Sequence, residues 1–165
     1  MDTITVRRAG TADRPFLAEM LYEAAFPPDA SRPPLDLAML EPRNRRFLDD
    51  WPSRPGDIGV IVLEGGRPIG AAWCRCFRGP EVLSPYADPA IPELAIAIVP
   101  DRRGRGVGRK LLMALCEEAR VEGLGGVDLG VGVSNTPAVR LYQALGFQEI
   151  ITDGRSVRMR RDLRA

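Results

Sequence analysis

The amino-acid sequence predicts a single α/β domain with a mixed central sheet of about six to seven strands and helices on both faces. The 165 residues are the length of one ordinary domain, and 45% of them are hydrophobic, which is enough to build a core. Segments with the apolar pattern of strands alternate with segments of helical periodicity. No internal repeat or low-complexity segment divides the chain, so we expect one domain over residues 1–165.

The chain is expected to begin with a strand followed by a helix. Residues 3–7 alternate in polarity and are rich in β-branched side chains, which favours a short strand. Thr11 or Asp13 is suited to cap the helix, because each side chain can accept a hydrogen bond from a free backbone N–H. Apolar residues then recur at three- and four-residue steps up to about residue 26, which gives the helix one apolar face. This face consists of Phe16, Leu17, Met20, Leu21 and Ala24.

The stretch 27–55 contains seven prolines and is expected to break into short pieces. Residues 35–40 and 44–51 are each long enough for a helix of one or two turns. The stretch is too long for a simple connector, and long loops of this kind are often binding elements.

Two strands and a loop are expected next. Residues 58–64 and 68–77 have the composition of strands, and Gly65-Gly66 between them favours a tight hairpin turn. Residues 79–92 contain four prolines and are expected to form a loop.

A buried strand and a long helix follow this loop. Residues 93–99 are almost continuously apolar, as in a central strand covered on both faces, and Pro100 ends the strand. Residues 106–122 have helical periodicity, and Gly123 is suited to end the helix. The buried stripe of this helix is expected to consist of Val107, Leu111, Leu112, Leu115 and Ala119.

The C-terminal part is expected to contain a strand, a capped helix and a final hairpin. Residues 127–133 are apolar enough for another buried strand. Asn135 or Thr136 can cap a helix that has Pro137 in its first turn and that Gly146 closes. The final pair of strands is expected at 147–152 and 156–161.

The composition argues against several classes of protein. The 23 basic and 22 acidic side chains nearly cancel, which argues against nucleic acid as a partner. No stretch approaches about 18 consecutive apolar residues, which argues against a membrane span. Residues 1–5 lack the layout of a signal peptide, so we expect a cytoplasmic location.

Histidine is absent from the sequence, which removes Ser-His-Asp and Cys-His catalysis and nearly every metal site built on imidazole. The three cysteines, Cys74, Cys76 and Cys116, have neither the number nor the spacing of a disulfide framework or a metal knuckle. We expect three reduced thiols, with Cys116 in the core, and therefore no metal site and no covalent acyl carrier.

The most informative passage is residues 99–112, where a buried strand ends, three glycines alternate with bulky residues, and a helix begins. The first N–H groups of a helix have no internal partner and lie at the positive end of its dipole. Gly104, Gly106 and Gly108 let the backbone wrap closely around a ligand, which predicts a phosphate cradle. The simpler alternative is a glycine-rich turn that only starts a helix. The arginines that add positive charge around the loop are Arg103, Arg105 and Arg109.

Two common nucleotide-binding patterns do not fit this loop. The dinucleotide fingerprint needs a third glycine five residues after the first, but Arg109 and Leu111 stand at those positions, and no P-loop Gly-Lys-Ser or Gly-Lys-Thr occurs. The pattern that fits is Arg-x-x-Gly-x-Gly, formed by Arg103, Gly106 and Gly108. In this pattern the chain resembles the GNAT acetyltransferase superfamily, whose strand, loop and helix bind the pyrophosphate of acetyl-coenzyme A.

A second motif supports the same resemblance. Residues 134–147 contain Asn135 at the exit of a strand, a short helix with Tyr142, and then Gly-Phe, as in that superfamily. The resemblance is strong over residues 92–147, and the order of elements agrees along nearly the whole chain. It implies a GNAT-like fold for this domain.

The resemblance also implies where acetyl-coenzyme A lies. The central parallel strands 93–99 and 127–133 would splay apart at their C-terminal ends, and the pantetheine arm would lie in the gap. Tyr142 would direct its hydroxyl at the thioester sulfur; the simpler alternative, from its helix face alone, is a core aromatic. The cofactor-binding residues implied are Ile98, Val99, Arg103, Gly104, Arg105, Gly106, Val107, Gly108, Arg109 and Asn135.

The reaction implied is direct acetyl transfer to an amine of a small molecule or a peptide. Tyr142 would protonate the departing thiolate, and Glu93 would take a proton from the amine, directly or through a water. A backbone N–H near Ile98 would stabilise the oxyanion. The alternative for Glu93 is that it only begins a strand and faces solvent.

The acceptor amine is expected opposite the cofactor, between the first helix, residues 27–55 and residues 79–92. The residues there that could hold a cation are Asp49, Asp50, Trp51, Tyr86 and Asp88. The alternative function is a regulatory module that binds acyl-coenzyme A without catalysis. A homodimer through the C-terminal strands is compatible with the sequence, which leaves the identity of the amine and the length of the acyl group open.

Overall fold

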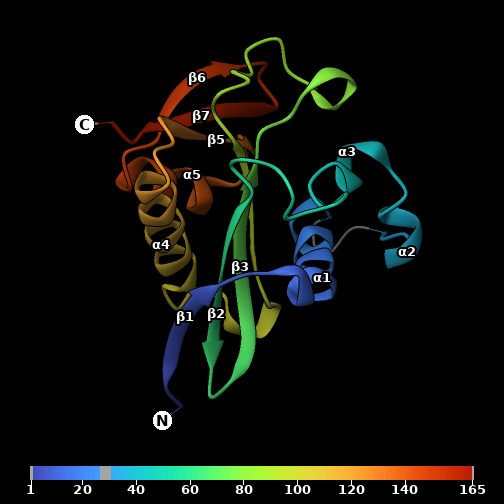
Figure 1. Cartoon of the computed structure of the whole chain (residues 1–165), viewed down its shortest axis with the longest axis vertical. Helices are drawn as coiled ribbons and strands as arrows, with labels where there is room; N and C mark the ends of the chain where they lie inside the picture. The colour runs from blue at the N-terminus through green and yellow to red at the C-terminus, as the bar shows by residue number, and fades with distance from the viewer. Residues whose placement is uncertain (1, 27–30, 165) are drawn as a thin grey trace.

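A computed structural model describes residues 2–26 and 31–164, so the first residues of the proline-rich stretch 27–55 and both ends of the predicted domain lie outside the described residues. Seven strands form one mixed sheet, as predicted (Figure 1). Their order across the sheet is β1-β2-β3-β4-β5-β7-β6. The strands are β1 (Ile4–Arg8), β2 (Ile58–Glu64), β3 (Arg67–Arg75), β4 (Glu93–Ile98), β5 (Gly126–Gly132), β6 (Gln148–Thr152) and β7 (Ser156–Asp162).

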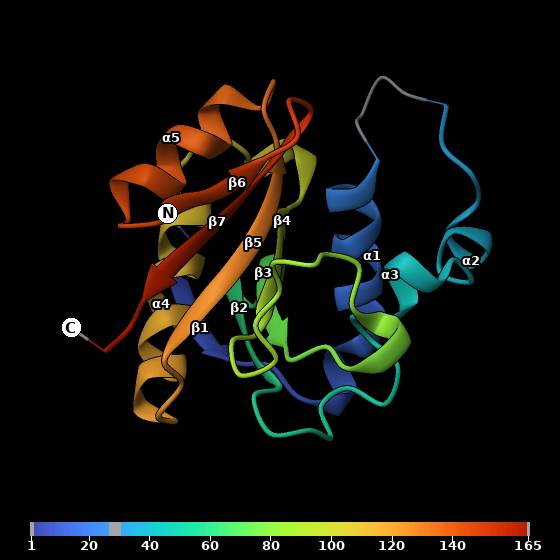
Figure 2. The same cartoon turned by 90° about the horizontal axis from the view of Figure 1, so that it is seen from above.

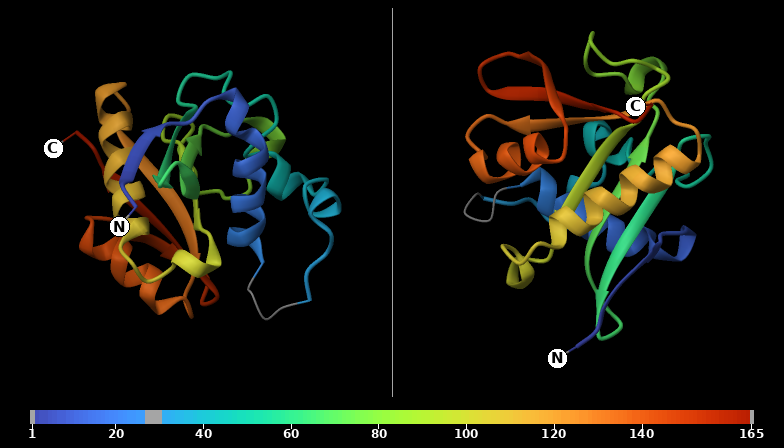
Figure 3. Two further views of the ribbon diagram at one scale, coloured as in Figure 1. Left: turned by 90° about the horizontal axis from the view of Figure 1, so that it is seen from below. Right: turned by 90° about the vertical axis from the view of Figure 1, so that its left-hand side faces the viewer.

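Helices cover both faces of the sheet, which confirms the predicted architecture. On one face α1 packs against β3 and β4, and on the other face α4 and α5 pack against the strands (Figures 2 and 3). The helices are α1 (Arg14–Ala25), α2 (Leu35–Ala38), α3 (Pro42–Arg45), α4 (Val107–Val121) and α5 (Thr136–Ala144). In the described part of the chain, every helix is too short or too polar to cross a bilayer.

The two central strands, β4 and β5, are parallel and separate almost at once. Glu93 and Asp128 form the one β4–β5 residue pair of the described strands, while each of the other neighbouring strands is antiparallel and pairs over several residues. Beyond that pair the sheet is open between β4 and β5, as the family resemblance implied. Strand β4 nevertheless has core on both faces: Leu94 packs in the core under α4, and Ala95 and Ala97 pack in the core under α1.

Helix α4 is held by the stripe that the sequence predicted, because all five of its residues are buried. Leu111, Leu112 and Leu115 are fully buried, and burying one leucine side chain contributes about 1.5–3 kcal/mol. Gly106 precedes the helix and Gly123 follows it, both with positive φ, so the two glycines set its ends.

Two predictions for the N-terminal half were wrong in detail. Ala24 is exposed, because the buried residues of α1 end at Leu21 and the last turn of the helix lies at the edge of the core. The helix expected at 44–51 is confined to α3, which begins and ends earlier, and turns follow it. Asp50 has a φ of 57°, which a right-handed helix does not allow, and the following Trp51 turns inward, where its indole N–H donates to the carbonyl of Cys74.

Candidate functional site

The loop between β4 and α4 has the local geometry of an anion cradle. The turn η3 (Pro100–Arg102) follows β4, and α4 begins at Val107. Gly104 and Gly106 have φ of 74° and 80°, in the left-handed region that glycine adopts without strain. A Cβ added at either glycine would meet nothing within 4 Å, so there is open space beside the loop. The first N–H groups of α4 have no partner within the helix, and the loop and the helix start therefore present free donors together.

The three arginines of the loop have different surroundings. Arg103 is engaged within the protein: its Nε donates to the carbonyl of Ile98 at 3.1 Å, and its Nη2 lies 3.0 Å from Glu23 on α1. Arg105 and Arg109 are exposed and form no hydrogen bond or ion pair with another described residue. The structure thus leaves the charges of Arg105 and Arg109 free, whereas Arg103 fastens the loop to the end of β4 and to α1.

The cradle, the end of β4 and α5 meet at Gly108 in the first turn of α4. A Cβ built on Gly108 would lie 3.4 Å from side-chain atoms of both Ile98 and Leu141. A Cβ at this position would thus be in van der Waals contact with both elements. The glycine joins the cradle to the helix that carries Tyr142.

The gap between β4 and β5 exposes backbone groups in the middle of the sheet. At its closed end, the N–H of Asp128 donates to the carbonyl of Pro92 at 2.9 Å. The N–H of Val99 donates to Ile69 on the opposite side, so by the alternation of an antiparallel ladder the N–H groups of Ile96 and Ile98 point toward β5. No β5 residue pairs with either, and buried backbone donors require a partner. The edge of β4 is thus available to a ligand that enters the gap.

Tyr142 lies on the inner face of α5; the residue is 8% exposed, and its ring packs against Phe147. Burial raises the pKa of Tyr142 to about 12, so the phenol is protonated at neutral pH. Its hydroxyl forms no hydrogen bond with a described residue. A fully buried hydroxyl without a partner would be exceptional, and among the described residues the one fully buried side-chain polar atom without a partner is Arg54 Nε. The Tyr142 hydroxyl is therefore in contact with solvent. The tyrosine is both a core aromatic and an accessible proton donor.

Glu93 lies at the closed end of the gap, beside Asp128 of β5. Its side chain is 15% exposed, which corrects the alternative that it faces solvent. One carboxylate oxygen lies 3.7 Å from Nη2 of Arg46, and the other lies 3.5 Å from Nη1 of Arg158. The carboxylate is therefore held between two cations at the start of the diverging strands.

The side chains expected around an acceptor do not form one group. Trp51 belongs to the core, Asp49 pairs with Arg45, and Asp50 lies 3.1 Å from Nη2 of the buried Arg75. The Asp88 carboxylate accepts from the N–H of Ala90, and Tyr86 is half exposed in the same loop. Asn135 caps α5: its side-chain oxygen accepts from the N–H of Ala138 at 3.4 Å.

Sequence reasoning did not identify a charged group on the sheet beside Glu93. Asp128 on β5 is fully buried and bonds to Arg158 and Arg160 on β7. The signal was present, because Asp128 interrupts an otherwise apolar strand and the two arginines alternate with Val157 and Met159. In the described residues no three or more acidic or cysteine side chains gather as a metal ion would require.

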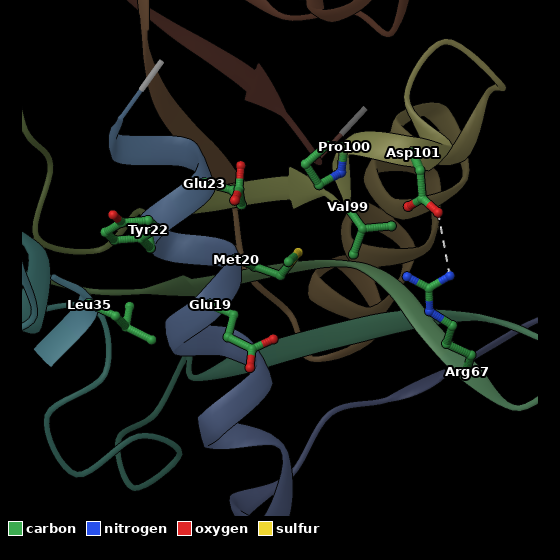
Figure 4. Close-up of a pocket in the computed structure, with 9 residues that line it drawn as sticks. All are labelled: Glu19, Met20, Tyr22, Glu23, Leu35, Arg67, Val99, Pro100 and Asp101. Atoms are coloured by element: carbon green, nitrogen blue, oxygen red, sulfur yellow. Dashed lines mark ion pairs between the residues drawn. The ribbon is translucent and has the colours of Figure 1, made fainter. Parts of the chain in front are cut away.

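A groove of about 400 Å³ lies beside the cradle on the α1 side (Figure 4). Figure 4 shows Met20 and Glu23 of α1 on one side, and Val99, Pro100 and Asp101 at the end of β4 on the other. Asp101 pairs with Arg67 at 3.6 Å on the side of the groove opposite α1. The groove thus separates α1 from the segment that leads into the cradle.

Comparison with known proteins relates this geometry to one family. Residues 18–147 match the sequence profile described as the acetyltransferase (GNAT) family. The chain is 34% identical over 106 residues to an uncharacterized N-acetyltransferase of Methanocaldococcus jannaschii, covering 63% of this chain and 45% of that protein. It is 34% identical over 115 residues to the mycothiol acetyltransferase of Thermobispora bispora, covering 69% of this chain and 37% of that protein. The chain thus spans less than half the length of these two relatives.

Solved structures share the fold along nearly the whole chain. A GNAT superfamily phosphinothricin acetyltransferase from Sinorhizobium meliloti, in complex with acetyl-coenzyme A, is 25% identical with a TM-score of 0.70, over 97% of this chain and 88% of that one. A putative acetyltransferase from Salmonella typhimurium, with its cofactor acetyl-coenzyme A, is 24% identical with a TM-score of 0.68, over 97% of this chain and 94% of that one.

Proposed function

This chain belongs to the GNAT family of acetyltransferases, and on that premise we propose that it transfers the acetyl group of acetyl-coenzyme A directly to an amine of a small molecule or a peptide. We propose further that residues 1–165 form one N-acetyltransferase domain. The observation that carries the proposal is the coincidence of an open glycine cradle with an unpaired strand edge: both lie at the C-terminal end of β4.

The cradle is proposed to bind the pyrophosphate of acetyl-coenzyme A. Backbone N–H groups of residues 104–109 would donate to its oxygens, with Arg105 and Arg109 as free cations at the rim. Arg103 acts differently in this proposal, because its guanidinium is already bound to Ile98 and Glu23. It would shape the loop and contribute charge from a distance. Asn135 would support the site by fixing the start of α5.

The pantetheine arm is proposed to lie along the exposed edge of β4. Ile98, Val99 and the neighbouring backbone would bind it through the groups that β5 leaves unpaired. In this proposal the thioester lies in the gap between the two strands. Tyr142 would face it from the side of the sheet that α4 and α5 cover, and Glu93 would face it from the side that α1 covers. The acceptor amine would approach from the face of α1.

The reaction proposed begins with proton loss from the acceptor, because an alkyl ammonium of pKa about 10.4 is almost fully protonated at neutral pH. Glu93 would take this proton, directly or through a water. The free nitrogen then attacks the thioester carbon, the C–N bond forms, and the oxyanion accepts a hydrogen bond from the N–H of Ile98. The C–S bond breaks as the carbonyl reforms. Of the two protons that leave the nitrogen, one ends on the coenzyme A thiol and one goes to water.

Tyr142 is proposed to stabilise the departing sulfur. Because the pKa of Tyr142 is about 12, its hydroxyl stays protonated across the working pH range. A thiol has a pKa of about 8.5, so complete transfer of the phenolic proton to the thiolate is uphill. The hydroxyl would therefore act chiefly by donating a strong hydrogen bond to the developing thiolate.

Two measurements on the purified chain test the proposal. Calorimetry with acetyl-coenzyme A measures binding, and release of free thiol measures turnover with a panel of amines: an alanine-ended peptide, phosphinothricin, glucosamine and spermidine. We expect binding, and acetyl-dependent thiol release with at least one amine. Binding without release for any amine would favour the regulatory module, and no binding would refute the cradle. A cytoplasmic location and a homodimer stay predictions.

A further inference from the structure

We propose that Arg158, which is hydrogen-bonded to the buried Asp128, is a positioning residue that orients the carboxylate of Glu93 toward the acceptor amine. This inference rests on the proposed function, and it assigns a part in the reaction to a charged group that the family patterns in the sequence do not include.

The residues concerned belong to three neighbouring strands of the sheet, β4, β5 and β7 (Figure 2). Glu93 pairs with Asp128, and Asp128 stands opposite Arg160, so their side chains emerge on the same face of the sheet. Arg158 is two residues from Arg160 on β7 and shares its face. It is the face of α1, because the alternate residues Val127 and Leu129, Val157 and Met159 point into the core under α4.

Asp128 holds both arginines in place. Its Oδ2 accepts from Nε of Arg158 at 3.1 Å, from Nη2 of Arg158 at 2.8 Å and from Nη2 of Arg160 at 2.8 Å, and its Oδ1 accepts from Nε of Arg160. Asp128 is fully buried, so these charge-assisted bonds are shielded from water. With Nε and Nη2 of Arg158 committed to Asp128, the remaining Nη1 lies 3.5 Å from Oε2 of Glu93.

A second fixed cation faces the other oxygen of Glu93. The guanidinium of Arg46 lies 4.0 Å from the ring centroid of Phe77, and its Nε and Nη1 donate to the carbonyls of Arg43 and Glu81. Its Nη2 lies 3.7 Å from Oε1 of Glu93. Arg46 and Arg158 are therefore both held by groups other than Glu93, so their positions do not depend on where the Glu93 carboxylate lies.

The two guanidinium groups lie 3.5 and 3.7 Å from the carboxylate oxygens of Glu93, within ion-pair range. These separations are long for hydrogen bonds between nitrogen and oxygen, and Glu93 accepts no side-chain hydrogen bond among the described residues. The two charges orient the carboxylate while its lone pairs stay free to accept a proton. Arg75, which stands opposite Glu93 on β3, commits its guanidinium to Asp57 and to the carbonyl of Asp49, so it does not compete for this carboxylate.

Arg160 offers a matched control for Arg158. Both arginines bond to Asp128 from the same strand, but only Arg158 forms an ion pair with Glu93. Replacement of either by lysine removes a planar fork from Asp128, and a merely structural role therefore predicts similar effects for the two variants. A positioning role predicts that only Arg158→Lys changes catalysis.

The experiment measures kcat, the KM for the amine and the acetyl-coenzyme A affinity of Arg158→Lys and Arg160→Lys, with the fastest amine of the panel above. We expect Arg158→Lys to lower kcat about tenfold or more, because misplacing a reacting group has effects of that order, and to leave acetyl-coenzyme A affinity within about twofold. Arg160→Lys should keep kcat within about twofold. In a Glu93→Gln background, Arg158→Lys should change the residual kcat by less than about twofold, since the group that it positions is gone.

Equal kcat losses in the two lysine variants would overturn the inference, as would an Arg158→Lys effect that persists undiminished in the Glu93→Gln background. If Arg158→Lys does not fold by circular dichroism, Arg158→Gln is judged by the same criteria, because it keeps a donor for Asp128 and removes the charge beside Glu93. Failure of the proposed function has a different signature: the unaltered protein itself would not bind acetyl-coenzyme A or would release no thiol with any amine of the panel.

Discussion

Replacement of Tyr142 by phenylalanine separates the chemistry of the hydroxyl from the packing of the ring. Tyr142 is 8% exposed, its ring packs against Phe147 with 5.8 Å between the ring centroids, and phenylalanine keeps that contact. The hydroxyl forms no hydrogen bond with a described residue, so its loss leaves no described protein group without a partner. We therefore expect the free energy of unfolding to change by less than about 1 kcal/mol.

The expected effect on turnover is much larger. A hydrogen bond to a charged group contributes about 1.5–3 kcal/mol. The sulfur carries its charge only as the C–S bond breaks, so this bond stabilises the transition state and not the bound thioester. Its loss in Tyr142→Phe should lower kcat about 10- to 150-fold and leave the Kd for acetyl-coenzyme A within about twofold.

Three measurements decide this prediction: thiol release for kcat, calorimetry for the Kd, and denaturant unfolding for stability. Tyr86→Phe is the control, because Tyr86 is 51% exposed in the loop before β4 and should keep kcat within about twofold. If Tyr142→Phe lost acetyl-coenzyme A affinity in proportion to kcat, the hydroxyl would belong to binding. If it lost several kcal/mol of unfolding free energy, the hydroxyl would have a structural role. Either result would refute the proposed part of Tyr142 in the reaction.

Two further predictions concern alkaline stability and the cradle. Burial raises the pKa of Tyr142 above its ordinary value of about 10, to about 12, so the neutral phenol stabilises the fold fully below pH 10 and this contribution is lost as the pH rises to about 12. Between neutral pH and pH 11 the free energy of unfolding of the unaltered protein should fall by about 1.4 kcal/mol more than that of Tyr142→Phe, as measured by denaturant unfolding. An identical pH dependence of the two proteins would contradict this. Gly106→Ala should weaken acetyl-coenzyme A binding about tenfold or more in calorimetry, because it strains a loop with φ of 80° and places a methyl group in the cradle. Gly123→Ala, with φ of 82° at the other end of α4, carries the same strain away from the cradle and should bind normally; equal losses of affinity would show that strain alone is responsible.

The elements that the sequence predicted well are those with strong local signals. Strand β2 has the predicted bounds, because a tight glycine turn follows it and its side chains are almost continuously apolar. Helix α4 begins after Gly106 and α5 is capped by Asn135, as expected, because backbone conformation and a side-chain cap act within a few residues. The open gap between β4 and β5 was expected only through the family resemblance, since divergence of two strands has no local signature.

Features that depend on distant partners could not be predicted from the sequence. Glu93 is oriented by Arg46 and Arg158, which lie more than forty residues away in either direction along the chain. Arg103 was expected only as a cation of the cradle, but Glu23 on α1 draws its side chain toward that helix. Trp51 was expected near an acceptor and lies in the core. Each of these outcomes depends on which elements pack together, and no pattern within one element encodes it.

The opening of the sheet between β4 and β5 has a consequence for local protection against solvent. In most sheets a central strand exchanges its amide hydrogens most slowly, because both edges are bonded. In β4 the protection should alternate: the amide of Ala97 is bonded to β3, whereas the amides of Ile96 and Ile98 face the gap. A strand at the centre of the molecule therefore contains fast-exchanging hydrogens beside slow ones. A thioester arm bound in the gap would slow the exchange of the Ile96 and Ile98 amides and leave that of Ala97 nearly unchanged. Hydrogen exchange of individual β4 amides would therefore report whether the arm is bound.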